Sequence, residues 1–339
     1  MRVNPSAARW LSIVRTGLWP AWWMMALVLI AAAGPRVRLA PKFLPGHTLR
    51  YRIEARTTTN ASTTTPIVNP EGASQATETI ALVVRLDVLS AQPAAGGSEG
   101  PVRFLATYEQ SSAKFESDAV DPSQPSLEDR YRRLEGRSLE FTVEPGGRLS
   151  DFQGLDELLA DRSAYQAAIS WLPGLLSIGR FPREGAMLGR TWKSERPLDG
   201  VPLAGLTWRA QSTYLRDEPC HPAGADVPAG AAPGPADSCA VILTRLQIVR
   251  SGSADAATTP EDYLRNGLRS SGSWTGSGES LDSLSLASGL LVSSTETSTQ
   301  EMDYVIASAA TGSSIHRRGR VQTQSEITLL SDARATAPR

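Results

Sequence analysis

The chain has 339 residues and carries 34 Lys and Arg against 35 Asp and Glu, a formal net charge of −1. Its length favours two domains of roughly 150 residues each. The charge balance gives no electrostatic reason to expect nucleic acid as a partner, so we expect none.

The N-terminal segment has the pattern of an export signal. Three arginines precede an uncharged run from Leu18 to Ala33, which is short for a bilayer span of about 20 residues. We expect residues 1–33 to be a signal peptide cleaved after Ala33. The alternative is an uncleaved N-terminal anchor, in which residues 18–33 make the only membrane contact. In both cases we expect the rest of the chain to be extracytoplasmic, either periplasmic or secreted.

After a linker over residues 34–45, we expect a first β-rich unit over residues 46–186. The stretch HTLRYRIEA alternates strictly, with Leu49, Tyr51 and Ile53 on one face and charged residues on the other. This alternation predicts a strand with one face on a core and one in water. The polar, Pro-containing stretch TTTNASTTTPIVNPEGASQ that follows predicts a long loop.

Two further alternating runs predict an antiparallel hairpin. In the first run, from Thr79 to Leu89, Leu82 and Val84 share a face, and in the second Phe104 and Tyr108 do the same. The runs are joined by the stretch SAQPAAGGSEGP, whose composition is typical of a loop.

One segment has a helical pattern. Its apolar residues recur at three- and four-residue spacing, which predicts an amphipathic helix over about 155–172, lying across the sheet. We expect Pro173 and Gly174 to end this helix.

The chain then repeats its opening, since GHTL at Gly46 is echoed by GRTW at Gly189. We therefore expect a second β-rich unit over residues 187–331, followed by a disordered tail over residues 332–339. The fold class that we predict is mainly β, with two tandem antiparallel, half-barrel-like sheets and one amphipathic helix.

The two cysteines of the chain, Cys220 and Cys239, bracket a segment rich in Ala, Pro and Gly between two strands of the second unit. An exported pair of cysteines is oxidised by default, so we expect a disulfide rather than a metal site that would also use His221 and His316. A closed loop of about 20 residues contributes roughly 3 kcal/mol in the chain-entropy model.

The Gly-led first strand, the paired strands, the turn SLASGLLVSS and the single helix resemble the curved half-barrels of exported bacterial proteins of the lipoprotein-carrier (LolA-like) type. The resemblance covers about residues 44–331. It implies a concave sheet with an apolar lining and a helix as a lid.

The sequence contains no recognisable catalytic constellation. The Gly-x-Ser-x-Gly elbow is absent, and SSAK at Ser111 lacks the context of a Ser-x-x-Lys nucleophile. Acidic residues such as Asp282 and Glu296 fit a solvated strand face better than a glycosidase pair. The basic stretch HRRGR at His316 fits a solvated hairpin turn, with docking of anionic lipid, glycan or cell-wall polymer as the alternative. We expect no enzymatic activity and no cofactor.

These observations favour a binding module of the bacterial envelope for an apolar or amphipathic ligand, such as lipid or another envelope component. The candidates to face this ligand are apolar strand residues that one interrupted helical stripe covers incompletely: Leu49, Tyr51, Ile53, Leu82, Val84, Phe104 and Tyr108. The alternative is that these residues form only core. The second candidate function is a structural or assembly component that acts through protein–protein contacts at exposed strands. The pattern makes no prediction of oligomeric state.

Overall fold

The computed structural model describes residues 36–64, 74–93, 99–118, 127–154, 167–177, 180–182, 184–198, 200–220, 237–250 and 258–334. These residues belong to one compact unit, Arg36–Arg339. The expected signal peptide or anchor, residues 1–33, lies outside the described residues and stays a prediction. In the part of the chain that the structure describes, no helix has the length and apolar character needed to cross a bilayer.

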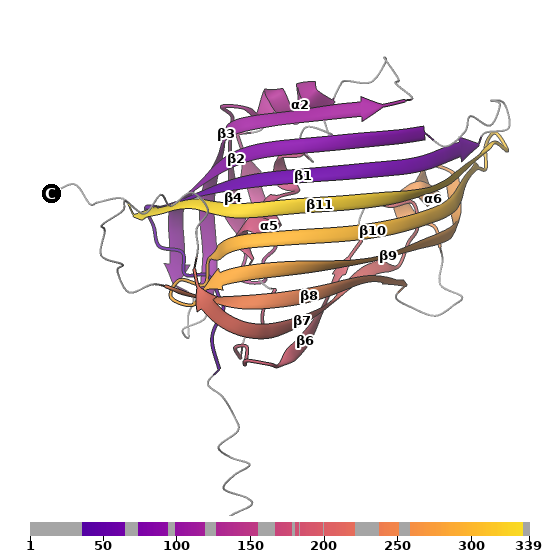
Figure 1. Cartoon of the computed structure of the whole chain (residues 1–339). Helices are drawn as coiled ribbons and strands as arrows, with labels where there is room; N and C mark the ends of the chain where they lie inside the picture. Colours follow the sequence, from indigo (N-terminus) through magenta and orange to yellow (C-terminus); the bar gives the residue numbers. More distant parts are fainter. Residues whose placement is uncertain are drawn as a thin grey trace, which may run out of the picture. The chain divides into compact units, whose positions relative to one another are not determined.

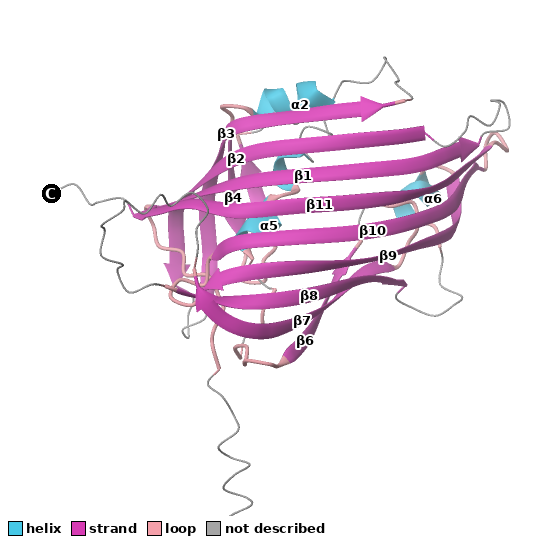
Figure 2. Ribbon diagram, viewed as in Figure 1, coloured by secondary structure: helices cyan, strands magenta, loops and turns pink. Residues whose placement is uncertain are grey.

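The described residues form eleven strands in a single antiparallel sheet (Figures 1 and 2). The order of the strands across the sheet is β5-β4-β3-β2-β1-β11-β10-β9-β8-β7-β6. A mainly β fold is thereby confirmed. The strands are β1 (His47–Thr64), β2 (Ser74–Pro93), β3 (Glu99–Ser117), β4 (Ser138–Val143), β5 (Leu149–Gln153), β6 (Thr191–Pro197), β7 (Leu206–Pro219), β8 (Ser238–Arg250), β9 (Leu268–Ser285), β10 (Leu291–Ser308) and β11 (Ser314–Arg334).

The first and last strands, β1 and β11, pair in the middle of the sheet (Figure 1). Their register runs from His47 opposite Arg334 to Thr64 opposite His316. The two tandem units expected over residues 46–186 and 187–331 are therefore not confirmed, since strands of both stretches build one sheet. Pairing β1 with β11 satisfies backbone groups that would be open edges in two separate sheets.

The helices among the described residues lie on one face of the sheet, which we call the inner face, and the opposite face is the outer face. They are α2 (Leu127–Leu134), α5 (Leu172–Leu176) and α6 (Glu261–Arg265). Buried side chains of α2 and α5 join the strand residues Tyr51 and Ile53 in one apolar cluster. Figure 1 looks onto the outer face, with α5 and α6 behind the strands.

The helix expected over 155–172 lies largely outside the described residues. Residues 167–169 are helical, a turn follows at 170–171, and α5 begins at Leu172. Pro173, which we expected to end a helix, lies in the first turn of α5. Proline is tolerated there because a backbone N–H in the first turn has no partner within the helix.

The described parts of the expected loop after the first strand are strand, because β1 continues to Thr64 and β2 begins at Ser74, and residues 65–73 lie outside the described residues. Threonines in this part of β1, such as Thr57 and Thr59, pair with β2 on one side and β11 on the other. Their β-branched side chains favour the extended backbone.

The described parts of both flanking segments make contacts with the rest of the fold. In the expected linker, residues 34–45, Val37 exchanges two backbone hydrogen bonds of 2.8 Å with Ala186, and Leu39 is buried. In the expected tail, β11 continues to Arg334, and the Asp332 carboxylate contacts the buried His47 imidazole. Residues 335–339 lie outside the described residues.

Two inner-face glycines of β9 allow neighbouring strands to come close. At Gly272, where φ is +134°, an added Cβ would clash with the backbone carbonyl of Asp303 on β10. At Gly276 it would lie 2.7 Å from Cδ1 of Ile248 on β8. Glycine at such positions lets a sheet curve, so these residues contribute to the bend of β9.

Candidate functional site

All seven residues predicted to face a ligand lie in the core, each with at most 1% of its surface exposed: Leu49, Tyr51, Ile53, Leu82, Val84, Phe104 and Tyr108. They pack in the apolar cluster that includes α2 and α5. The Tyr51 hydroxyl donates a hydrogen bond of 3.1 Å to the Leu291 carbonyl, and the Tyr108 hydroxyl donates to the Ala168 carbonyl. Burial raises the pKa of both phenols. Protein side chains surround these residues, and their contact with a ligand stays a prediction.

The predicted disulfide between Cys220 and Cys239 is confirmed, with an S–S distance of 2.05 Å and a Cα–Cα distance of 5.0 Å. It joins the end of β7 to the start of β8, where Glu218 lies opposite Cys239. The Cys239 side chain is buried at the margin of the apolar cluster. The bond closes the base of the β7–β8 connection, whose residues 221–236 lie outside the described part.

A belt of polar side chains crosses the inner face from β11 to β7. One row of directly paired residues runs through Ser325, Glu296, Ser280, Thr244 and Ser212. In the adjacent row Ser294 lies opposite Asp282. Strand alternation turns all of them toward the helices. We call these residues the polar belt: Ser212, Thr244, Ser280, Asp282, Ser294, Glu296 and Ser325.

The solvated strand face expected for the acidic residues is therefore wrong for Asp282, which is 1% exposed. Its Oδ1 accepts a hydrogen bond of 2.6 Å from the Ser294 hydroxyl, and its Oδ2 lies 3.2 Å from the Arg180 guanidinium. Bonds of this kind, with an ionised partner, are the stronger hydrogen bonds of proteins. They compensate for the removal of the Asp282 carboxylate from water.

Glu296 is half-buried on the neighbouring strand and is affected by the same charges. Burial raises the pKa of its carboxyl, Arg180 and Arg196 act to lower it, and Asp282 raises it further. Directly opposite, the Ser280 hydroxyl is buried and makes no hydrogen bond in the described structure. The belt therefore combines a carboxyl whose pKa is raised by burial with a hydroxyl that has unused hydrogen-bonding capacity.

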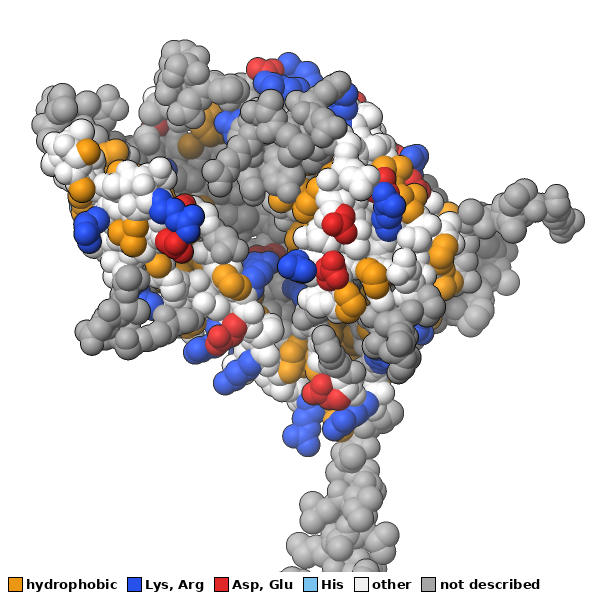
Figure 3. Space-filling view, turned by 180° about the vertical axis from the view of Figure 1, so that it is seen from behind, with side chains coloured by type: hydrophobic (Ala, Val, Ile, Leu, Met, Phe, Trp, Pro, Cys, Tyr) orange, Lys and Arg blue, Asp and Glu red, His pale blue; other side chains and the backbone are white. Residues whose placement is uncertain are grey.

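The polar belt separates apolar clusters that lie toward the two ends of the strands. On β10, Val292 belongs to the cluster on one side of the belt, and Met302 and Tyr304 belong to the cluster on the other. In the second cluster the Tyr304 ring stacks on Trp274 at a centroid distance of 5.8 Å. From the side opposite to Figure 1, apolar side chains and both kinds of charged side chains are visible close together (Figure 3). The inner face is thus amphipathic along the strands.

The two described histidines, His47 and His316, take no part in this arrangement. His316 lies 2.7 Å from Asp303, and both side chains are exposed. HRRGR lies within β11, not in a turn as expected, because it pairs with both β10 and β1. Among the described residues, no group of three or more His, Cys, Asp or Glu could hold a metal ion.

Comparisons with known proteins give a distant likeness in fold. No family model matches the chain, and no curated protein matches it. Among solved structures, it is similar to one of lipovitellin that concerns lipid–protein interactions, with a TM-score of 0.47 and 11% identity over 88% of this chain. The chain spans 26% of the length of the lipovitellin chain. The lipoprotein-carrier resemblance stays a prediction.

Proposed function

We propose that this chain is a binding module that holds an amphipathic ligand against the inner face of its sheet. The polar group of the ligand lies at the polar belt, and its apolar part lies on a neighbouring apolar cluster. The observation that carries this proposal is the placement of buried charged and hydroxyl groups between two apolar clusters. A ligand that is apolar throughout would leave the buried polar groups of the belt without partners, which costs free energy.

The chemistry of the belt favours a polar group that can both donate and accept hydrogen bonds. The Ser280 hydroxyl and the Glu296 carboxyl are directly opposite each other, and Arg180 is partly exposed beside them. A hydroxyl, amide or phosphate head group of a lipid would satisfy these groups. The natural ligand is then a lipid or another amphipathic component of the envelope.

The proposed location is outside the cytoplasm. The disulfide between Cys220 and Cys239 supports it, because such bonds persist in oxidising compartments. The signal-like pattern of residues 1–33 supports it independently.

The alternative of an assembly component that acts by strand pairing has less support. The edge strands β5 and β6 have five and seven residues, and β6 ends at Pro197. On β3 beyond its pairing with β4, the backbone N–H of Phe115 donates a 2.6 Å hydrogen bond to Glu128 of α2. Short edges and blocked N–H groups are typical of sheets that avoid pairing with other chains.

The test is saturable binding of a fluorescent fatty-acid analogue to the folded full chain, displaced by lipid extracted from bacterial envelopes. We expect Ser280→Leu, which extends an apolar side chain into the belt, to weaken binding of the analogue. The control is Ser277→Leu on the outer face of the same strand, which should leave binding unchanged. Absence of saturable binding, or equal loss in both variants, would contradict the proposal.

A further inference from the structure

The outer face carries a hollow of about 840 Å³ that the proposed inner-face site does not use. It crosses six adjacent strands, from β1 through β11, β10, β9 and β8 to β7. Six strands at a spacing of about 4.8 Å span roughly 24 Å. The hollow therefore fits an elongated ligand that lies across the strands on the face seen in Figure 1.

Side-chain length explains the hollow. In one row of paired residues, the short Thr299 and Ser277 lie in the middle, between Gln322 on β11 and Gln247 on β8. Gly278, which has no side chain, also lines the hollow. Long side chains at both ends and short ones in the middle leave a polar depression in an otherwise continuous sheet surface.

The lining has the chemistry of a site for a hydroxylated, acidic ligand. Its outward side chains are mainly amides, hydroxyls and guanidinium groups, which suit hydroxyl and carboxylate partners and do not suit a lipid tail. Three arginines, Arg56, Arg209 and Arg245, line it with one carboxylate, Glu279. This local excess of positive charge occurs in a chain whose net charge is −1.

One of the three arginines is available for an anion. Arg245 lies 3.2 Å from Glu279, and Arg209 lies 2.9 Å from Glu195. Arg56 is exposed and makes no ion pair within the described ranges of the chain, although its charge contributes to lowering the pKa of Glu116, which is paired with Lys114. A ligand carboxylate at Arg56 would therefore gain a charge-assisted hydrogen bond without displacing an existing partner.

The surroundings limit the charge density of the ligand. A second hollow shares Arg56, Thr297 and Gln324 with the first and is also lined by Glu54 and Glu326. These carboxylates would repel a ligand that carries a charge on every unit. The hollow offers one arginine without an ion pair and many neutral hydrogen-bonding groups. A ligand with few carboxylates among neutral, hydroxylated units would match these groups.

We propose that this hollow binds an acidic polysaccharide in which carboxylates alternate with neutral, hydroxylated sugars. The probe is a hyaluronan hexasaccharide, titrated into the full chain by calorimetry. A neutral chito-hexasaccharide and a heparin hexasaccharide serve as comparators. We expect the hyaluronan hexasaccharide to bind most tightly of the three, and its affinity to fall as salt is raised.

The variant Arg56→Gln should lower this affinity by about tenfold, which corresponds to about 1.4 kcal/mol. The matched control is Arg52→Gln, which removes an exposed arginine on the same face of β1 outside the hollow. It should bind as the unchanged chain does. Ser277→Tyr should also weaken binding, because it fills the middle of the hollow without changing the charge.

Three outcomes would overturn the proposal: no binding of the hexasaccharide, equal loss in the Arg56 and Arg52 variants, or equal affinity for the neutral comparator. Binding of anionic vesicles that depends on Arg56, without binding of the hexasaccharide, would assign the hollow to a membrane surface and overturn it as well. Fatty-acid binding at the inner face should be unchanged in Arg56→Gln, so failure of the two proposals can be told apart.

Discussion

Arg180 and Asp282 form an ion pair in which the guanidinium is 35% exposed and the carboxylate is 1% exposed. The 3.2 Å contact joins the segment after α5 to the inner face of β9, although the two residues are 102 positions apart. The pair therefore fixes a covering segment to the sheet beside the polar belt. The Asp282 carboxylate is buried and the Arg180 guanidinium is partly solvated, so substitution of Asp282 is the better test of the pair.

We expect Asp282→Asn to lower the free energy of unfolding by about 2–4 kcal/mol, because it weakens a buried pair and leaves a hydrogen-bond network unmatched. The control is Glu279→Gln on the same strand, which breaks an ion pair of equal length, 3.2 Å, between exposed side chains. That change should cost less than about 0.5 kcal/mol. Urea unfolding at neutral pH measures both, and equal effects would contradict the assignment of Asp282 to the interior.

Stability should also depend on the protonation of Glu296. Burial raises the pKa of Glu296, so between the ordinary pKa of a glutamate and this raised value the folded state binds more protons than the unfolded state. The protein therefore loses stability as the pH rises through that window.

The variant Glu296→Gln cannot ionise, so its stability relative to the unchanged chain should increase over the same window and then level off. Urea unfolding at a series of pH values measures the difference. Glu301→Gln, an exposed change on the other face of β10, is the control. A pH-independent difference for Glu296→Gln would contradict the expected ionisation.

Loss of the disulfide should destabilise the chain by about 3 kcal/mol, as expected for a closed loop of about 20 residues. The double variant Cys220→Ala/Cys239→Ala and the reduced unchanged chain should therefore melt at similar, lower temperatures. A reducing agent should have no effect on the double variant. Thiol labelling of the unreduced, denatured chain should find no free thiol, and full labelling would disprove the bond.

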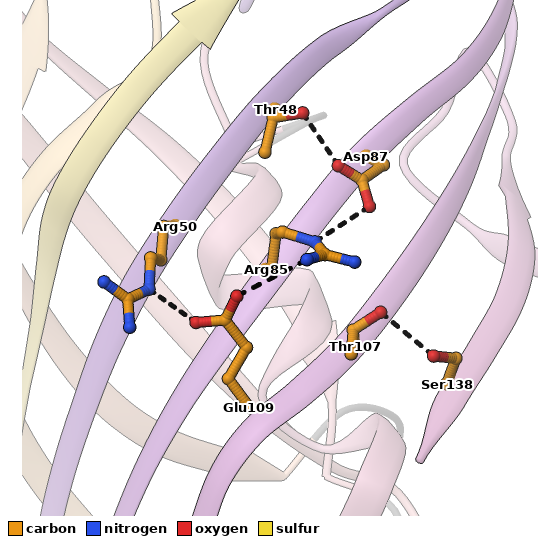
Figure 4. A network of polar contacts seen from close by, with 7 residues as sticks. All are labelled: Thr48, Arg50, Arg85, Asp87, Thr107, Glu109 and Ser138. Carbon is orange, nitrogen blue, oxygen red and sulfur yellow. Dashed lines mark hydrogen bonds and ion pairs between the residues drawn. The ribbon is translucent and has the colours of Figure 1, made fainter. Parts of the chain in front are cut away.

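The carboxylate of Glu109 bridges two arginines on the outer face (Figure 4). It lies 2.5 Å from Arg50 and 3.6 Å from Arg85, which are directly opposite each other on β1 and β2. Glu109→Ala would leave Arg50 without a carboxylate opposite Arg85, which keeps Asp87 at 3.0 Å, so we expect the free energy of unfolding to fall by about 1 kcal/mol at low salt. The loss should shrink at high salt and in an Arg85→Ala background. If salt does not change the loss of stability, the loss comes from packing and not from charge repulsion.

Substitution of a glycine in the curved part of β9 should lower the free energy of unfolding. Gly272→Ala places a Cβ against the Asp303 carbonyl at a backbone φ of +134°, so we expect loss of several kcal/mol or failure to fold. Gly146→Ala, where nothing lies within 4 Å of the added Cβ, should be neutral or slightly stabilising. Soluble yield and thermal melting of the two variants provide the comparison.

The strands could be predicted from sequence because their periodicity is local. The alternation of Leu49, Tyr51 and Ile53 does place these side chains on the inner face. The pairing of β1 with β11 could not be predicted in this way, because no local pattern records which distant strand is the neighbour. The echo of GHTL and GRTW indicated two similar units, although β1 lies in the centre of the sheet and β6 at its edge.

The polar belt was missed for a related reason. On β9 the apolar Leu281 is 40% exposed and Asp282 is 1% exposed, the reverse of the usual relation between polarity and burial. Periodicity shows that adjacent residues face opposite ways, but it does not show which face is inside. The alternating small hydroxyl residues of β9 and β10, such as Ser277 and Thr299, lie on the outer face, so this pattern does not mark the belt either.

The central pairing of β1 with β11 affects the order of folding as well as the final structure. Residues near position 50 find their neighbours near position 330, so the sheet has a high contact order and its central joint closes last during synthesis. Until then β1 and β10 each present an open edge. This order of events favours delayed folding, which requires that the growing chain be kept from pairing with other chains until β11 has been synthesised.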